Sequence, residues 1–338
     1  MYRIIVLNLF SKILIDRIWY SKNIFGLPLI PFSFIYIFLI KLRKIFYQIG
    51  LFSTNKPNTP IIVVGNITIG GTGKTPLVIW LASYYKKLGY SPGIISRGYK
   101  GKYTSATKLV TINDSPVLVG DEPLLIKRNT NCPVIVGRDR VNAAKEIIEK
   151  HNCNLVISDD GLQHYSLGRD IEIAVIDGQR RFGNGHCIPA GPLRELKDRL
   201  DSVDLVVSKY HAKKYEYKME YIYNDLVSLN NPEKTMPISG LNSKKIHAIS
   251  GISNPENFFS FLRSKNFELL IHEYPDHHIF NESDIKFNDN LPVVMTEKDA
   301  VKCFDYVNEN CWYQPISVKL SESFIANLNK ILGKLKDG

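Results

Sequence analysis

The residues whose types and spacing most directly imply chemistry lie at positions 68–75, which read Thr-Ile-Gly-Gly-Thr-Gly-Lys-Thr. Glycines in such a loop let backbone N–H groups surround phosphate oxygens, and a following helix adds the positive end of its dipole. Lys74 would contact the β- and γ-phosphates, and the Thr75 hydroxyl would bind Mg²⁺. The segment predicts a nucleotide-phosphate site formed by Thr68, Ile69, Gly70, Gly71, Thr72, Gly73, Lys74 and Thr75.

This loop departs from the general phosphate-loop pattern at its first position, where Thr68 replaces the usual glycine. A glycine-rich structural turn before a helix is the alternative interpretation. However, the apolar run 61–64 precedes the loop and a helical pattern follows it from Lys74 to Leu88. Because the motif requires this order of strand, loop and helix, the context favours the phosphate site.

A pair of acidic residues, Asp159 and Asp160, follows the apolar run 155–158. In α/β sheets, ligands bind beyond the carboxyl ends of the strands, and carboxylate oxygens are preferred ligands of Mg²⁺. A simple Asp-Asp-Gly turn is the alternative. With a phosphate loop upstream, we expect this pair to hold the Mg²⁺ that accompanies the nucleotide.

Three further segments carry side chains that could act on an acceptor. Phosphorylation of a hydroxyl needs a carboxylate that takes or orients the proton, and Asp121 or Glu122 could serve. Capping of the short helix that follows is the commoner role for such a pair. A histidine of the segment 274–278 could tune a neighbouring carboxylate, and Arg194 could meet an anionic head group.

The elements that must position these residues alternate between apolar runs and helical patterns from residue 60 onward. This order predicts an α/β fold with a parallel sheet covered by helices on both faces. A second alternating stretch begins at Ile246 and predicts a smaller α/β lobe. The expected organisation is an N-terminal helical arm at 1–52, a phosphate-loop core at 53–210, a linker at 211–243 that could include an edge hairpin, the smaller lobe at 244–320, and a C-terminal helix at 321–338.

The composition is that of a globular protein, with 44% hydrophobic and 22% charged residues, which excludes disorder, collagen and a coiled coil. The five cysteines are widely spaced and odd in number, so buried free thiols are expected instead of disulfides or a zinc site. The net charge of +10 points to an anionic partner.

The basic charge is concentrated in an apolar N-terminal arm, because residues 1–52 hold seven basic residues and one acidic residue. This local excess argues against nucleic acid and for a membrane surface with anionic lipids. Ile24–Ile40 has no charged residue, but as a helix it would reach only about 26 Å across a hydrocarbon core of about 30 Å. An interfacial or half-inserted anchor is therefore expected, with helices packed on the catalytic domain as the alternative.

Taken together, these motifs resemble the tetraacyldisaccharide 4′-kinase family of lipid A biosynthesis. Thr68, which departs from the general motif, agrees with this family. The similar segments occur in the family's order and cover most of the chain from about residue 60 to 302: Val64–Pro76, Ile95–Gly101, Val119–Pro123, Ser158–His164, Arg169–Asp177, Phe182–Glu195, Tyr274–His278 and Thr296–Lys302.

The resemblance implies a two-lobed enzyme that transfers the γ-phosphoryl group of ATP to the 4′-hydroxyl of a tetraacylated glucosamine disaccharide 1-phosphate, giving lipid IVA. It also implies a place on the cytoplasmic face of the bacterial inner membrane. By matching motif, Asp121 would be the base and His277 its partner, although His278 adjoins it and the choice between them stays open. The remaining implied roles are Mg²⁺ binding by Asp159 and Asp160 with Glu122 nearby, a site lined by Gln163 and His164, and substrate contacts from Arg97 and Arg194.

Two other classes of protein share part of this pattern. Another phosphate-loop enzyme, such as an amidating ligase or a cofactor-assembly ATPase, would share Lys74 and the Asp159 region. It would not need the apolar arm, or the acidic pair at 121–122 together with the histidines at 277–278. A membrane-bound nucleotide-binding scaffold without catalysis is the third possibility.

Overall fold

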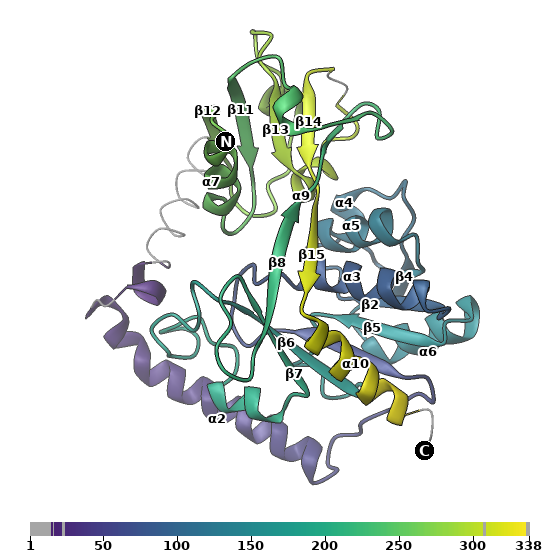
Figure 1. The fold of residues 1–338 in the computed structure, drawn as a ribbon. Coiled ribbons are helices and arrows are strands. Elements are labelled where there is room, and N and C mark those ends of the chain that lie inside the picture. The colour runs from purple at the N-terminus through teal and green to yellow at the C-terminus, as the bar shows by residue number, and fades with distance from the viewer. Residues whose placement is uncertain (1–14, 16, 22–23, 307–308, 336–338) are drawn as a thin grey trace.

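The computed structural model describes residues 15, 17–21, 24–306 and 309–335. Within them the strands form two sheets, one in a larger lobe and one in a smaller lobe above it in Figure 1. Helices pack on both sheets, in agreement with the predicted α/β class. Of the helical arm predicted at 1–52, residues 1–14, 16 and 22–23 lie outside the described residues.

The sheet of the larger lobe is parallel except at its two edges. Strand β1 lies beside β5 and β6, and its residues are buried along its whole length, as expected for a strand covered on both faces. The strands β3 and β15 pair antiparallel with their neighbours. In spatial order the strands are β15 (Ile316–Leu320), β8 (Tyr217–Tyr223), β7 (Leu205–Lys209), β6 (Ile171–Asp177), β1 (Ile61–Gly65), β5 (Leu155–Asp159), β2 (Pro92–Ser96), β4 (Val134–Gly137) and β3 (Thr107–Leu109).

Helices bury apolar side chains on the two faces of this sheet. Leu77 and Leu81 of α3 and Phe324 of α10 belong to the core on one face. Ala144 and Ile147 of α6 belong to the core on the other face. The helices and short 3-10 helix of this lobe are α3 (Lys74–Lys87), α4 (Pro116–Val119), α5 (Asp121–Thr130), α6 (Arg140–His151), η2 (Lys197–Ser202) and α10 (Glu322–Lys334).

The smaller lobe is built on a sheet of six strands with a parallel centre. Its spatial order is β10 (Thr235–Met236), β9 (Leu226–Ser228), β14 (Cys311–Gln314), β13 (Val293–Thr296), β11 (Lys245–Ser250) and β12 (Glu268–Glu273). The helices here are η3 (Ile238–Gly240), α7 (Glu256–Ser264), α8 (Glu282–Ile285) and α9 (Glu297–Ala300).

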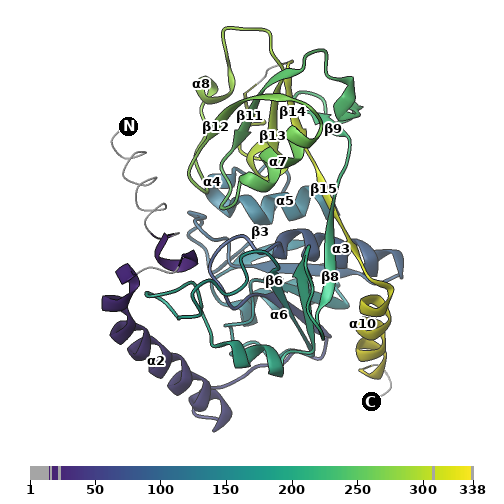
Figure 2. The same cartoon turned by 60° about the vertical axis from the view of Figure 1, so that its left-hand side comes forward.

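Two chain segments run between the lobes, side by side in both views (Figures 1 and 2). One contains β8, which lies in the segment predicted as a linker, and the other contains β15, which lies in the range predicted for the smaller lobe. In the structure β8 and β15 pair with each other and extend the larger sheet. Their partners are distant in sequence, so local periodicity could not assign them to this sheet.

The N-terminal arm consists of η1 (Ile24–Leu29) and α2 (Ile30–Gln48), which lies along the larger lobe (Figure 2). By length and composition alone, the helical stretch Phe25–Gln48 could cross a membrane. Most of its side chains face outward, including Phe34 at 67% exposure and Phe38 at 64%. The five cysteines are buried and free, as predicted.

Candidate active site

The phosphate loop lies at the carboxyl end of β1 and leads directly into α3. Gly73 precedes the helix with φ 98°, and Gly70 has φ 113°, a region that residues with a Cβ rarely adopt. A Cβ on Gly73 would also lie 2.6 Å from the Tyr221 hydroxyl oxygen. The Asn66 amide donates to the Thr72 hydroxyl at 3.2 Å, which ties the two ends of the loop together. Lys74 and Thr75 then occupy the first turn of α3, as the motif requires.

Asp159 ends β5, the strand next to β1, and is paired in register with Val64. Its carboxyl group is almost fully buried, and its Oδ1 atom has no hydrogen-bond partner within the described part of the chain. Burial, followed by the nearby Glu122 carboxylate, raises the pKa of Asp159 to about 7, against the opposing effect of Lys74. A cation bound beside this carboxylate would offset the cost of its burial.

Asp160 lies between two cations at the phosphate loop. Its Oδ1 atom is 3.5 Å from Lys74 Nζ and 2.9 Å from an Arg194 guanidinium nitrogen. Burial acts to raise the pKa of Asp160, but Lys74 and Arg194 outweigh it and hold the pKa well below its usual value. Arg194 also donates to the Asn66 side chain at 3.0 Å. The sequence suggested Arg194 as a substrate contact. In the structure its guanidinium group forms an ion pair with Asp160.

The acidic pair at 121–122 opens α5, with Gly120 as its N-cap, and lies at the junction of the two lobes. The Nδ1 atom of His277, from the loop after β12, is 3.0 Å from Asp121 Oδ2. The adjacent His278 instead lies 3.0 Å from Asp284 and stacks on Tyr274. Of the two histidines that the sequence left open, the structure brings His277 to Asp121.

Two lysines of the segment 296–302 complete this junction. Lys302 Nζ lies 3.8 Å from Asp121 Oδ2. Lys298 Nζ lies 3.1 Å from Glu122 and 3.4 Å from Asp276. Burial acts to raise the pKa of Asp121, but the hydrogen bond from His277 and the charge of Lys302 outweigh it and lower the pKa. Sequence analysis did not assign these lysines, although their segment follows a strand end and matches a family motif.

Gln163 and His164 follow the acidic pair in the loop after β5. The Gln163 side-chain amide donates to the backbone oxygen of Asn66 at 3.0 Å and to Glu195 at 2.6 Å. Burial, followed by the positive charges of the nearby Arg140 and Arg97, lowers the pKa of His164 to about 4, so the imidazole is neutral at pH 7. Glu195 is buried and was not assigned a role from sequence.

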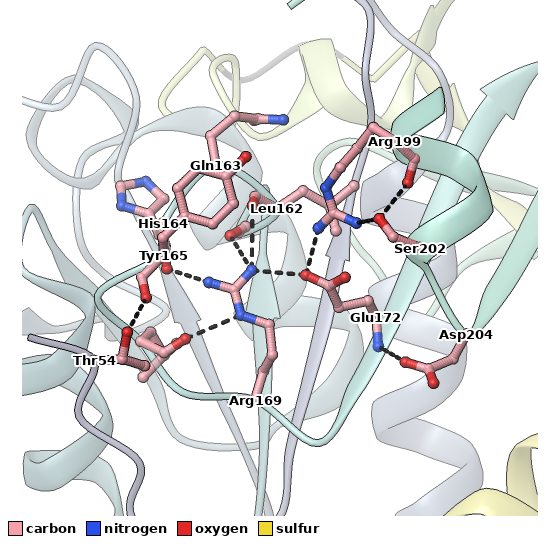
Figure 3. A network of polar contacts seen from close by, with 12 residues as sticks. Thr54, Leu162, Gln163, His164, Tyr165, Arg169, Glu172, Arg199, Ser202 and Asp204 are labelled. Atoms are coloured by element: carbon pink, nitrogen blue, oxygen red, sulfur yellow. Dashed lines mark hydrogen bonds and ion pairs between the residues drawn. The ribbon is translucent and has the colours of Figure 1, made fainter. Parts of the chain in front are cut away.

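The backbone of this loop is held by a partly buried ionic network (Figure 3). Arg169 donates to the carbonyl oxygens of Leu162 and His164, and its guanidinium lies 3.0 Å from Glu172. Glu172 also binds Arg199 at 2.6 Å. Arg169 therefore fixes the turn that begins at the metal-binding candidates and carries Gln163 and His164.

The chain is similar to known proteins over most of its length. Residues 25–333 match the model of the Tetraacyldisaccharide-1-P 4′-kinase family. A tetraacyldisaccharide 4′-kinase of Nitrosococcus oceani is 46% identical over 319 residues, which cover 94% of each chain. The corresponding protein of Legionella pneumophila (strain Corby) is 44% identical over 310 residues, which cover 92% of this chain and 94% of the relative.

This chain belongs to the tetraacyldisaccharide 4′-kinase family. It is therefore a lipid A 4′-kinase, and the sequence-based predictions of family and enzyme class are confirmed. A crystal structure of LpxK from Aquifex aeolicus in complex with ATP superposes with a TM-score of 0.77 at 28% identity, covering 92% of this chain and 99% of that one. The match confirms the predicted fold class. The ligase, ATPase and scaffold alternatives are not favoured.

Proposed function

We propose that Asp121 is the general base with which this kinase transfers the γ-phosphoryl group of ATP to the 4′-hydroxyl of its acylated disaccharide substrate. The observation that carries the proposal is the Asp121–His277 contact of 3.0 Å at the lobe junction. His277 orients the carboxylate, and the lowered pKa of Asp121 keeps it ionised and able to accept the hydroxyl proton. The ATP complex of the Aquifex aeolicus relative supports ATP as the donor.

Lys74 and the glycines before it bind the phosphates in this proposal. Backbone N–H groups of the loop and the amino end of α3 face the phosphate oxygens, and Lys74 balances the charge of the transferred group. Asp160, which follows β5 and is itself bound by Arg194, orients Lys74.

The residues present fit a Mg²⁺ ion. At the strand end next to the phosphate loop, the buried Oδ1 atom of Asp159 has no hydrogen-bond partner among the described residues, and Thr75 occupies the first turn of α3. No group of three or more His, Cys, Asp or Glu side chains forms a metal site among the residues described. In nucleotide sites, Mg²⁺ is usually bound by one or two carboxylates together with substrate phosphates. Asp159, Asp160 and Thr75 would hold the ion, with Glu122 nearby. An Mg²⁺ ion held by these residues would offset negative charge on the nucleotide phosphates.

Arg97, Gln163 and His164 are proposed to line the acceptor site. Arg97 is exposed after β2, and the substrate carries a 1-phosphate that a guanidinium would recognise. The neutral imidazole of His164 lies within the field of Arg97 and Arg140, where an anionic group would be favoured.

Transfer of label from [γ-³²P]ATP to a tetraacylated disaccharide 1-phosphate in mixed micelles tests this function. With Mg²⁺ present we expect labelled lipid and little free phosphate. Chelation of the metal with EDTA should abolish the transfer, and added Mg²⁺ should restore it. Release of free phosphate without labelled lipid would instead support an ATPase, and neither product would support a scaffold.

We also propose that the arm seats the enzyme on the cytoplasmic face of the inner membrane. The outward side of α2 is rich in phenylalanine, and Lys41, Arg43 and Lys44 follow the apolar run, where they would meet anionic headgroups. Replacing both Phe34 and Phe38 with serine should lower sedimentation with vesicles of anionic phospholipid by about tenfold or more. Undiminished sedimentation of this variant, or of a chain that lacks residues 1–45, would contradict the anchor.

A further inference from the structure

One side of α2 faces the protein instead of solvent. Ser33 is only 3% exposed, although the flanking Phe32 and Phe34 are 58% and 67% exposed. The Ser33 hydroxyl donates to the Cys187 carbonyl oxygen at 2.7 Å and accepts from the Ala190 N–H at 3.1 Å. Membrane anchoring alone does not require a buried serine with two long-range hydrogen bonds.

The next turn of α2 makes the same kind of contact. The Tyr36 hydroxyl donates to the backbone oxygen of Arg194 at 2.9 Å. Tyr36 and Ile37 pack against an apolar cluster that contains Ile67 and Leu193. Positions 33, 36 and 37 share one face of a helix. We call Ser33, Tyr36 and Ile37 the docking face of α2.

The segment that receives the docking face, residues 182–195, is here called the platform loop. Its other side is bonded to the start of the phosphate loop. The Ile69 N–H donates to the Pro192 carbonyl oxygen at 2.8 Å, and the Arg194 N–H donates to the Ile67 carbonyl oxygen at 2.7 Å. Thr68 and Leu193 form an antiparallel bridge between the two segments.

Arg194 connects the docking face of α2 to the charged residues beside the phosphate loop. Its backbone oxygen accepts from Tyr36, while its side chain binds Asp160 at 2.9 Å. Asp160 in turn lies 3.5 Å from Lys74. A continuous path of hydrogen bonds and ion pairs thus leads from the membrane helix through the platform loop to the lysine that binds phosphate.

We propose that Ser33 and Tyr36 are positioning residues for phosphoryl transfer, and that α2 is part of the scaffold of the active site as well as a membrane anchor. The proposal rests on the proposed roles of Lys74, Asp160 and Arg194 in binding phosphate. Because the lipid-facing side and the docking face belong to one rigid helix, seating the helix in the bilayer fixes the phosphate loop relative to the membrane surface. The donor phosphate is then held at a fixed height relative to the membrane surface. There it can reach the acceptor hydroxyl of a lipid that stays in the bilayer.

The variants Ser33→Ala and Tyr36→Phe test the proposal, because each removes a hydroxyl without removing apolar surface. We expect each to lower kcat about fivefold, and the pair about twentyfold, at saturating ATP and lipid in mixed micelles. Sedimentation with anionic vesicles should stay within about twofold of the unchanged protein. The variants Ser260→Ala and Tyr215→Phe remove the same groups at exposed positions and should leave kcat unchanged.

Two results would overturn the proposal: kcat unchanged in the double variant with Ser33 and Tyr36 altered, or a fall in activity that merely follows a loss of vesicle binding. Thermal unfolding of each variant separates a folding defect from a catalytic one, and the isosteric Tyr36→Phe gives the decisive result if Ser33→Ala does not fold. Arg194→Gln, assayed alongside, tests the underlying assignment. If that variant keeps full activity, the role of Arg194 fails independently of what the α2 variants show.

Discussion

Replacing Asp121 with alanine or asparagine is expected to lower kcat about 10²- to 10⁴-fold, with the affinity for a non-hydrolysable ATP analogue changed by no more than about twofold. The reason is geometric and electrostatic. Asp121 lies with His277 at the lobe junction, while the loop proposed to bind the phosphates lies at the carboxyl end of β1. Loss of the carboxylate removes the proton acceptor and leaves the phosphate loop intact. Steady-state kinetics with the lipid acceptor and calorimetric titration of the analogue measure the two effects.

The two adjacent histidines provide a matched control for this prediction. His277→Asn should lower kcat by a smaller factor than the Asp121 variants, because it acts through the carboxylate. His278→Asn should leave kcat within about twofold, since His278 contacts Asp284 and Tyr274 instead. Near-normal turnover of Asp121→Asn would remove Asp121 as the base, and equal losses at both histidines would contradict the assignment of His277.

Lys74→Ala should impair both nucleotide binding and turnover. Its ammonium group is the cation at the start of α3, and its loss leaves Asp160 with Arg194 as the remaining partner. We expect the Kd for the ATP analogue to rise about tenfold or more, and kcat to fall about 10²- to 10³-fold, because the charge that grows on the phosphates in the transition state is no longer balanced. The same titration and kinetic assay measure both quantities.

A lysine far from the loop serves as the control. Lys56 forms an ion pair of 2.7 Å with Asp170, and its side chain is 54% exposed. Asp170 also accepts from the Ile61 N–H at the start of β1, the end of the strand opposite the phosphate loop, so Lys56→Ala should leave kcat and nucleotide affinity within about twofold. A Lys74→Ala protein that binds the analogue normally would show that the lysine does not contact the phosphates.

The predicted site residues differ in how far the sequence could place them. The phosphate loop and the acid at the end of β5 were predicted together, because strand, loop and helix signals are local and parallel strands end at one edge of a sheet. The histidine could not be chosen from sequence, because 277 and 278 are adjacent and which one faces Asp121 depends on the conformation of their loop. The contacts of Lys298 and Lys302 with the acidic pair at 121–122 could not be predicted from sequence, because they form only where the smaller lobe packs against the larger one.

The sequence by itself determined the α/β class, the phosphate loop at 68–75, the acidic pair at 159–160 and, through the joint order of its motifs, the kinase family. These features depend on neighbouring residues, and local periodicity and turn chemistry encode them directly. Only the tertiary structure decided that β8 and β15 join the larger sheet, that Arg194 binds Asp160, and that Ser33 fastens α2 to the platform loop. The last of these contacts joins residues 154 positions apart, and such pairings arise from packing of complementary surfaces, which no spacing along the chain specifies.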